Sequence, residues 1–155
     1  LFAFVIESIF MEEDKCNPKD LLKQEGIKIT KNRLDVLKKM IESSTLLDAS
    51  SLHKRLNANS KINLATVYRI LKLLREKGIL RSIRGENGIE LFEMACQHNP
   101  LHPHFYCRKC GKTFCLKPLY FDVLKTLFPM AEGCDVENIA ITLSGICPRC
   151  KKEKI

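Results

Sequence analysis

Hydrophobic residues recur at intervals of three and four through the first half of the chain, which is the spacing of a helix face. A short helix is predicted over 17–26, because Asn17 is a good N-terminal cap and Gly26 is a good terminator. Two more helices are predicted, one after Thr30 and one after the capping residue Asp48. The first of these two has an apolar face made by Leu34, Leu37, Met40 and Ile41.

A fourth helix, predicted over 63–78, divides most sharply into two faces. At 100° per residue its branched apolar side chains fall within one arc of about 120°, and mainly polar side chains fill the opposite arc. One face therefore packs on a core, and the other is free to contact a partner. The apolar arc holds Leu64, Val67, Ile70, Leu71 and Leu74, and the opposite arc holds Ala65, Tyr68, Arg69, Lys72, Arg75 and Glu76.

Two short alternating strands follow, joined by a turn at 85–88 with glycine at both ends, which predicts a hairpin. Helices followed by a hairpin are the outline of a winged helix, a DNA-binding domain whose recognition helix enters the major groove. Near the base edges we expect Thr66, Tyr68 and Arg69, with packing on the helix flank as the alternative for Tyr68. As phosphate contacts we expect Arg33, Lys61, Lys72, Arg81 and Arg84.

Charge supports this interpretation. The 155 residues carry a formal net charge of +8, and residues 17–84 alone carry +10, with 16 Lys and Arg against 6 Asp and Glu. Such a distribution is typical of polyanion binders, although a solvated lysine-rich surface is the alternative. No segment approaches the roughly 20 apolar residues of a membrane span, so we expect no membrane contact. Four of the eight cysteines form two C-x-x-C pairs, which indicate metal binding more than disulfides, so we expect a cytoplasmic protein. Residues 1–16 are interpreted as an N-terminal extension, of which 1–10 are either over-extended reading frame or a short docking helix.

The second half is organised by cysteines. Cys107 and Cys110 form one C-x-x-C pair, and Cys147 and Cys150 form another. Four thiolates at about 2.3 Å complete the tetrahedral shell of a structural zinc ion and leave no position for a substrate. A redox dithiol is the alternative for 147–150, but such motifs open a helix inside a βαβ unit. Between the pairs we expect a helix over 119–128 and a strand over 137–144.

Four further residues could bind a second ion. His102 and His104 would point to the same side of a strand, because side chains alternate along it. With the thiolate of Cys96 and the carboxylate of Glu93 they make a borderline-soft set that suits Zn²⁺ better than Mg²⁺ or Mn²⁺. In the alternative interpretation the histidines are exposed and Cys96 is simply buried.

Several segments together resemble the ferric uptake regulator family in order and spacing. They are "GIKITKNRLDVLKKM", "INLATVYRILKLLREKGIL", "LFEM", "HPHFYCRKCGKTF" and "GICPRC", and the resemblance covers about residues 18–150. It implies a homodimeric, metal-dependent repressor that is not an enzyme and takes no small-molecule substrate. It also implies an α+β fold, with a winged helix-turn-helix domain over 17–94 and a small metal-binding dimerisation domain over 95–155. The partner would be double-stranded DNA with a near-palindromic operator.

The resemblance also implies residue roles. Cys107, Cys110, Cys147 and Cys150 match the structural zinc ligands, and residues 65–69, with Ala65, match the DNA-reading helix. His102 and His104 match the regulatory His-x-His, Glu93 matches a carboxylate used by many iron sensors, and Cys96 falls where zinc uptake regulators place a cysteine ligand.

Two departures concern the sensed metal. Leu46 stands where iron and peroxide sensors commonly have a histidine, and Cys115 stands where they have an acid. Neither favours an oxygen-rich shell, so zinc is favoured as the regulatory metal. Iron sensing and peroxide sensing are the alternatives within the family. A more remote alternative is a zinc-buffering or redox-sensing protein that uses Cys96 and Cys115.

Overall fold

A computed structural model describes residues 16–57, 61–85, 88–96, 99–119, 126, 129, 133–135 and 139–152. The helices are α1 Pro18–Gln24, α2 Lys31–Ile41, α3 Ala49–Asn57, α4 Leu64–Glu76 and α6 Pro148–Lys152. The strands are β1 Leu80–Arg84, β2 Glu90–Met94, β3 His104–Cys107, β4 Thr113–Cys115 and β5 Thr142–Gly145. The predicted α+β class is therefore confirmed. None of the described helices is long and apolar enough to cross a membrane.

The four N-terminal helices begin at the residues that the sequence marks as caps. In each case a side-chain oxygen accepts a hydrogen bond from a free backbone N–H of the first turn, which stabilises the helix start. Asn63 accepts from the N–H of Thr66 at 2.8 Å, and Asp48 accepts from the N–H of Ser51 at 2.9 Å. Asn17 and Thr30 do the same for α1 and α2.

The main core lies where α2, α3 and α4 meet. Val67, Ile70, Leu71 and Leu74 of α4 are buried there, as the two-faced pattern predicts, and Leu64 is half-buried. Full burial of each such side chain stabilises the fold by about 1.5–3 kcal/mol. The opposite face of α4 stays on the surface, so the helix has an unobstructed side for a partner.

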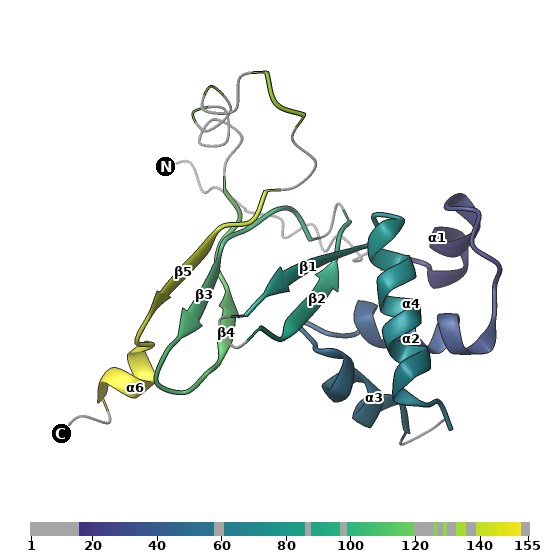
Figure 1. The fold of residues 1–155 in the computed structure, drawn as a ribbon, viewed down its shortest axis with the longest axis horizontal. Coiled ribbons are helices and arrows are strands. Elements are labelled where there is room, and N and C mark those ends of the chain that lie inside the picture. The colour runs from purple at the N-terminus through teal and green to yellow at the C-terminus, as the bar shows by residue number, and fades with distance from the viewer. Residues whose placement is uncertain are drawn as a thin grey trace, which may run out of the picture.

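The predicted hairpin is confirmed as β1 and β2, which pair antiparallel from Leu80 opposite Met94 to Arg84 opposite Glu90. It lies between the helices and the second sheet (Figure 1). Phe92 is buried and exchanges two backbone hydrogen bonds with Leu47, at 2.8 and 3.0 Å, so the hairpin is attached to the segment before α3. The hairpin position thus depends on the helical core.

The second sheet has the order β4-β3-β5, with β4 antiparallel and β5 parallel to the central β3. In its ladders His104 pairs with both Cys115 and Thr142. The strand predicted over 137–144 is observed as Thr142–Gly145, because β5 pairs only along the four residues of β3. Most of the helix predicted over 119–128 lies outside the described residues. The domain boundary at 94/95 stays a prediction.

Two candidate metal centres and a candidate DNA-binding face

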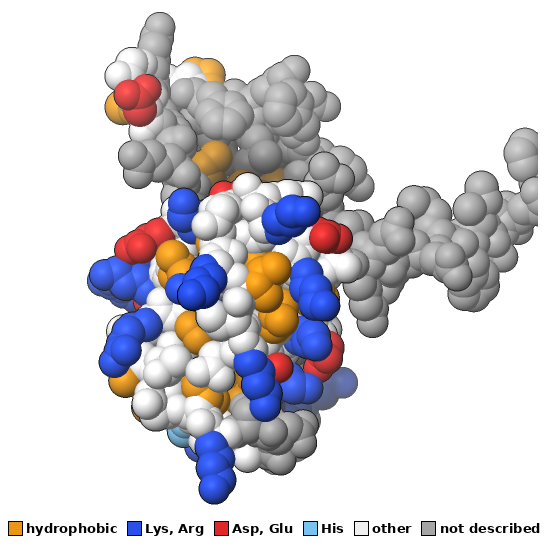
Figure 2. Space-filling model, turned by 90° about the vertical axis from the view of Figure 1, so that its right-hand side faces the viewer, with side chains coloured by type: hydrophobic (Ala, Val, Ile, Leu, Met, Phe, Trp, Pro, Cys, Tyr) orange, Lys and Arg blue, Asp and Glu red, His pale blue; other side chains and the backbone are white. Residues whose placement is uncertain are grey.

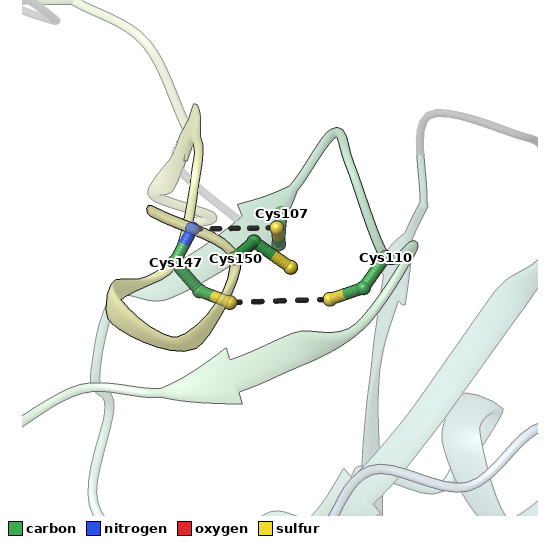
Figure 3. Close-up of side chains that lie close together, drawn as sticks. All are labelled: Cys107, Cys110, Cys147 and Cys150. Atoms are coloured by element: carbon green, nitrogen blue, oxygen red, sulfur yellow. Dashed lines mark hydrogen bonds between the residues drawn. The ribbon is translucent and has the colours of Figure 1, made fainter. Parts of the chain in front are cut away.

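Four cysteine sulfurs converge at the end of the second sheet. Cys107 ends β3 and Cys110 lies in the turn after it, whereas Cys147 and Cys150 lie just before and within α6 (Figure 3). Their sulfurs all lie within 4.8 Å of one another, and those of Cys110 and Cys147 are 4.0 Å apart. Four sulfurs at about 2.3 Å from one zinc ion are separated by roughly 3.8 Å. The sulfur positions therefore fit a tetrahedral ion.

The electrostatics of this group suit a bound cation. The backbone N–H of Cys147 lies 3.3 Å from the sulfur of Cys107, and this contact, with others from Cys110 and Lys109, outweighs burial and lowers the pKa of Cys107 to about 6. Burial and the neighbouring sulfurs raise the pKa of Cys150 to about 12. Four crowded sulfurs cannot all be thiolates without a dication among them. With all four bound, the shell is closed, as in a structural zinc site.

A second group lies between the hairpin and the second sheet. Glu93 comes from β2, His102 lies two residues before β3, His104 is the first residue of β3, and Cys115 ends β4. One ligand atom from each lies within 4.8 Å of all the others. Nε2 of His102 and of His104 are 3.2 and 3.5 Å from Oε2 of Glu93. The carboxylate and both imidazoles are buried, whereas Cys115 is exposed to solvent.

The hydrogen bonding of this second group leaves lone pairs for an ion. Nδ1 of His102 lies 2.8 Å from the carbonyl oxygen of Pro100, which can only accept, so Nδ1 carries a proton and, in the neutral ring, Nε2 offers its lone pair. In the described part of the chain, the buried Nε2 atoms of both histidines approach Oε2 of Glu93 but have no well-formed hydrogen bond. Buried polar atoms without such a bond are rare, and a bound ion would satisfy them.

The charge state of Glu93 and Cys115 also bears on ion binding. Burial raises the pKa of Glu93, but the contact with His104 and the charge of Arg81 outweigh it, so the net pKa is lowered and the carboxylate is available as a ligand. Burial and the charge of Glu93 raise the pKa of Cys115. An ion bound there must therefore displace the proton of Cys115.

The structure does not bring Cys96 into the second group, and this expectation needs correction. Cys96 lies two residues beyond the end of β2, packs against the helical core and interacts with the thiol of Cys16. Cys115 takes its place, because the β3–β4 ladder puts it opposite His104. Cys115 was not predicted as a ligand, and the sequence signal that could have identified it is its position where iron and peroxide sensors commonly have an acid.

The predicted DNA-contacting residues lie mostly on the surface of the helical part. Tyr68 is 53% exposed, which argues against the alternative of a packing role. Figure 2 shows Lys and Arg side chains spread across a face of this part, with fewer acidic ones. The exposed members are Lys61, Ala65, Tyr68, Arg69, Lys72 and Arg84, and the half-buried ones are Arg33 and Thr66.

Arg81 differs from the other predicted phosphate contacts. Its side chain is 21% exposed and forms an ion pair with Glu93, at 3.0 Å. It also donates to the carbonyl oxygen of Asn99 at 2.7 Å. A guanidinium held by these acceptors is not free to follow a phosphate, so we remove Arg81 from the candidate DNA-binding face.

Comparison with known proteins shows the family to which the chain belongs. The Ferric uptake regulator family matches residues 24–144. The chain belongs to this family. It is therefore a metal-responsive, DNA-binding transcription regulator, as the sequence predicts, and members of the family are not enzymes.

Individual members of the family share both sequence and fold with the chain. The ferric uptake regulation protein of Campylobacter jejuni is 30% identical over 139 residues, which are 88% of this chain and 87% of that protein. The crystal structure of the Vibrio cholerae ferric uptake regulator has a TM-score of 0.68 and 28% identity, over 84% of this chain and 100% of that one. A zinc uptake regulator in complex with zinc and DNA has the same fold, with a TM-score of 0.61 and 24% identity, over 88% and 91% of the two chains.

Proposed function

We propose that the chain is a zinc-responsive repressor whose regulatory ligands are Glu93, His102, His104 and Cys115. The observation that carries this proposal is the donor set, which contains one thiol, two imidazoles with unpartnered Nε2 atoms and one carboxylate. Such a mixed, borderline-soft set of four suits zinc better than Mn²⁺ or Mg²⁺, which prefer oxygen ligands. In this proposal Cys107, Cys110, Cys147 and Cys150 hold a separate structural zinc ion.

The second group is suited to regulation because its ligands come from two parts of the fold. Glu93 lies on the hairpin that directly follows α4, whereas His104 and Cys115 lie on the second sheet and His102 lies on the segment that enters it. An ion bound by ligands from the hairpin and from the second sheet fixes the position of the hairpin, and with it the position of α4. Raising the binding-competent population from 1% to 99% requires about 5.5 kcal/mol of preference for that state, a size that four metal–ligand bonds supply.

The proposed partner is duplex DNA, bound by a homodimer. A two-fold dimer presents two copies of α4, so its operator is near-palindromic, with half-sites about one helical turn apart or a multiple of it. The exposed face of α4 and the surrounding cations support this role.

Iron is the second candidate for the regulatory metal. One observation favours it, namely the buried carboxylate of Glu93, since an oxygen donor suits the harder Fe²⁺. The C. jejuni relative is a ferric uptake regulation protein. The thiol of Cys115 is the feature that favours zinc over iron in this chain.

A metal titration of DNA binding tests the proposal. Full-length protein that retains one structural zinc ion per chain is used to select an operator from random duplexes, and gel shifts then follow binding against buffered free Zn²⁺ or, without oxygen, Fe²⁺. We expect zinc to induce binding at lower free concentration than iron. Stronger induction by iron would reverse the metal assignment, and operator binding without any added metal would overturn the sensor itself. The matched control is Cys96→Ser, which should respond as the parent protein does.

A further inference from the structure

Arg81 lies next to the second candidate metal centre and contacts only one of the two carboxylate oxygens of Glu93. It stands opposite Glu93 in the hairpin register. Both Nε and Nη2 of Arg81 are 3.0 Å from Oε1 of Glu93, whereas both histidines face Oε2. The two carboxylate oxygens therefore have separate partners, one the guanidinium and the other the ligand group.

The guanidinium is itself fixed by the segment that leads to β3. Nη2 of Arg81 donates to the carbonyl oxygens of Asn99 and Pro100, at 2.7 and 3.3 Å. The Pro100 oxygen also accepts from Nδ1 of His102. The segment is held in turn by Asn99, whose side chain donates to the carbonyl of Met94 at 2.7 Å. Arg81 thus cannot follow a rotation of the carboxylate without losing several hydrogen bonds.

We propose that Arg81 is a positioning residue that limits Glu93 to one-oxygen coordination and so selects a four-coordinate ion. This inference rests on the proposed function, in which Glu93, His102, His104 and Cys115 bind the regulatory metal. Two-oxygen coordination would turn Oε1 away from the guanidinium and leave a largely buried charge without its partner, which is costly.

The coordination numbers that ions prefer turn this restriction into selectivity. Ions that prefer six ligands, such as Mn²⁺ and Mg²⁺, generally bind oxygen donors and keep several waters. A Glu93 that supplies one oxygen favours zinc, which is satisfied by four ligands.

The test compares metal selectivity in Arg81→Gln with that in the parent protein. Both carry the structural zinc ion, and the second centre is titrated with Zn²⁺, Mn²⁺ and, as a spectroscopic probe, Co²⁺. The ratio of the Mn²⁺ and Zn²⁺ dissociation constants is measured because the loss of a positive charge affects both dications alike and cancels. We expect this ratio to fall at least tenfold in Arg81→Gln, and the intense visible bands of four-coordinate Co²⁺ to weaken.

Two further variants keep the result interpretable. Arg84→Gln removes an exposed cation from the same strand and should leave the ratio and the Co²⁺ spectrum unchanged. Arg81→Lys keeps the charge but lacks the planar fork, so we expect the same loss of selectivity as in Arg81→Gln, and it serves as the test protein if the glutamine variant does not fold. An unchanged ratio in either Arg81 variant would overturn the role of Arg81 alone. A parent protein that binds no Co²⁺ beyond its structural zinc would overturn the proposed function, and the role of Arg81 with it.

Discussion

Nε2 of His102 lies 3.2 Å from Oε2 of Glu93, although one residue belongs to the hairpin and the other to the segment that enters the second sheet. His104 approaches the same oxygen at 3.5 Å. The two parts of the fold therefore meet at side chains of the types that ligate metals, and not at an apolar packing contact. In the proposed function this relationship connects ion binding to the position of α4, which the hairpin follows directly.

Cys115 and Cys96 should differ in their effect on metal binding. We expect Cys115→Ser to weaken zinc binding at the second centre at least about tenfold, because a thiolate ligand is replaced by a poorer hydroxyl donor. Cys96→Ser should change it by less than about twofold. Competition with a chromophoric chelator, on protein that keeps its structural zinc, measures both. An equal loss of zinc affinity in the two variants would show that Cys96 is also a ligand.

Loss of one structural cysteine should unfold the end of the chain around α6. In Cys150→Ser three sulfurs remain, the closed shell opens and the free energy of zinc binding no longer contributes to folding. We expect zinc content to fall by about one ion per chain and the melting temperature to fall by more than about 10 °C. Elemental analysis and calorimetry measure these changes. Cys134→Ser, which alters an exposed thiol outside both ligand groups, is the control and should melt as the parent does.

Asp48 should make a pH-dependent contribution to stability. Burial raises its pKa, but the hydrogen bonds from Ser51 outweigh burial and hold the pKa below the ordinary value of 3.8. A lowered folded pKa means that the charged carboxylate stabilises the fold above pH 3.8, and that this contribution is lost as the pH falls through the folded value. Asp48→Ala should therefore cost about 1 kcal/mol at pH 7 and less at low pH.

Urea unfolding at a series of pH values measures the contribution of Asp48. Asn63→Ala is the matched control, because Asn63 caps α4 with a neutral side chain. Its cost should be similar in size and independent of pH over the same range. A cost for Asp48→Ala that stays constant down to pH 3 would show that its charge has no part in the cap.

Substitutions in the candidate DNA-binding face should differ in how they change the salt dependence of DNA affinity. Arg84→Ala removes an expected phosphate contact, so the slope of log K against log salt should become shallower by about 0.9. Tyr68→Ala removes a side chain expected near the base edges, so it should relax sequence preference and leave the slope almost unchanged. Fluorescence anisotropy at several salt concentrations measures both. Lys112→Ala, in the turn between β3 and β4, should alter neither, and a flat salt response of the parent would contradict the proposed face.

Features that depend on neighbours in sequence were predictable from the sequence. Asn17, Thr30, Asp48 and Asn63 are followed by helices because a cap needs only the backbone of the next turn. The two C-x-x-C pairs and the hairpin around 85–88 are local in the same sense. The two-faced pattern of α4 also predicted correctly which side is buried, since helix geometry alone sets the faces.

The composition of the second metal centre was decided only by the tertiary structure. Glu93, His102 and His104 were predicted, but the choice between Cys96 and Cys115 depends on the β3–β4 register and on the direction of the chain after β2. The position of Arg81 likewise depends on cross-strand pairing with Glu93. Sequence periodicity reports the face on which a residue lies, whereas pairing between distant segments determines which residues share that face, and in this chain that pairing sets which side chains meet in the second candidate group.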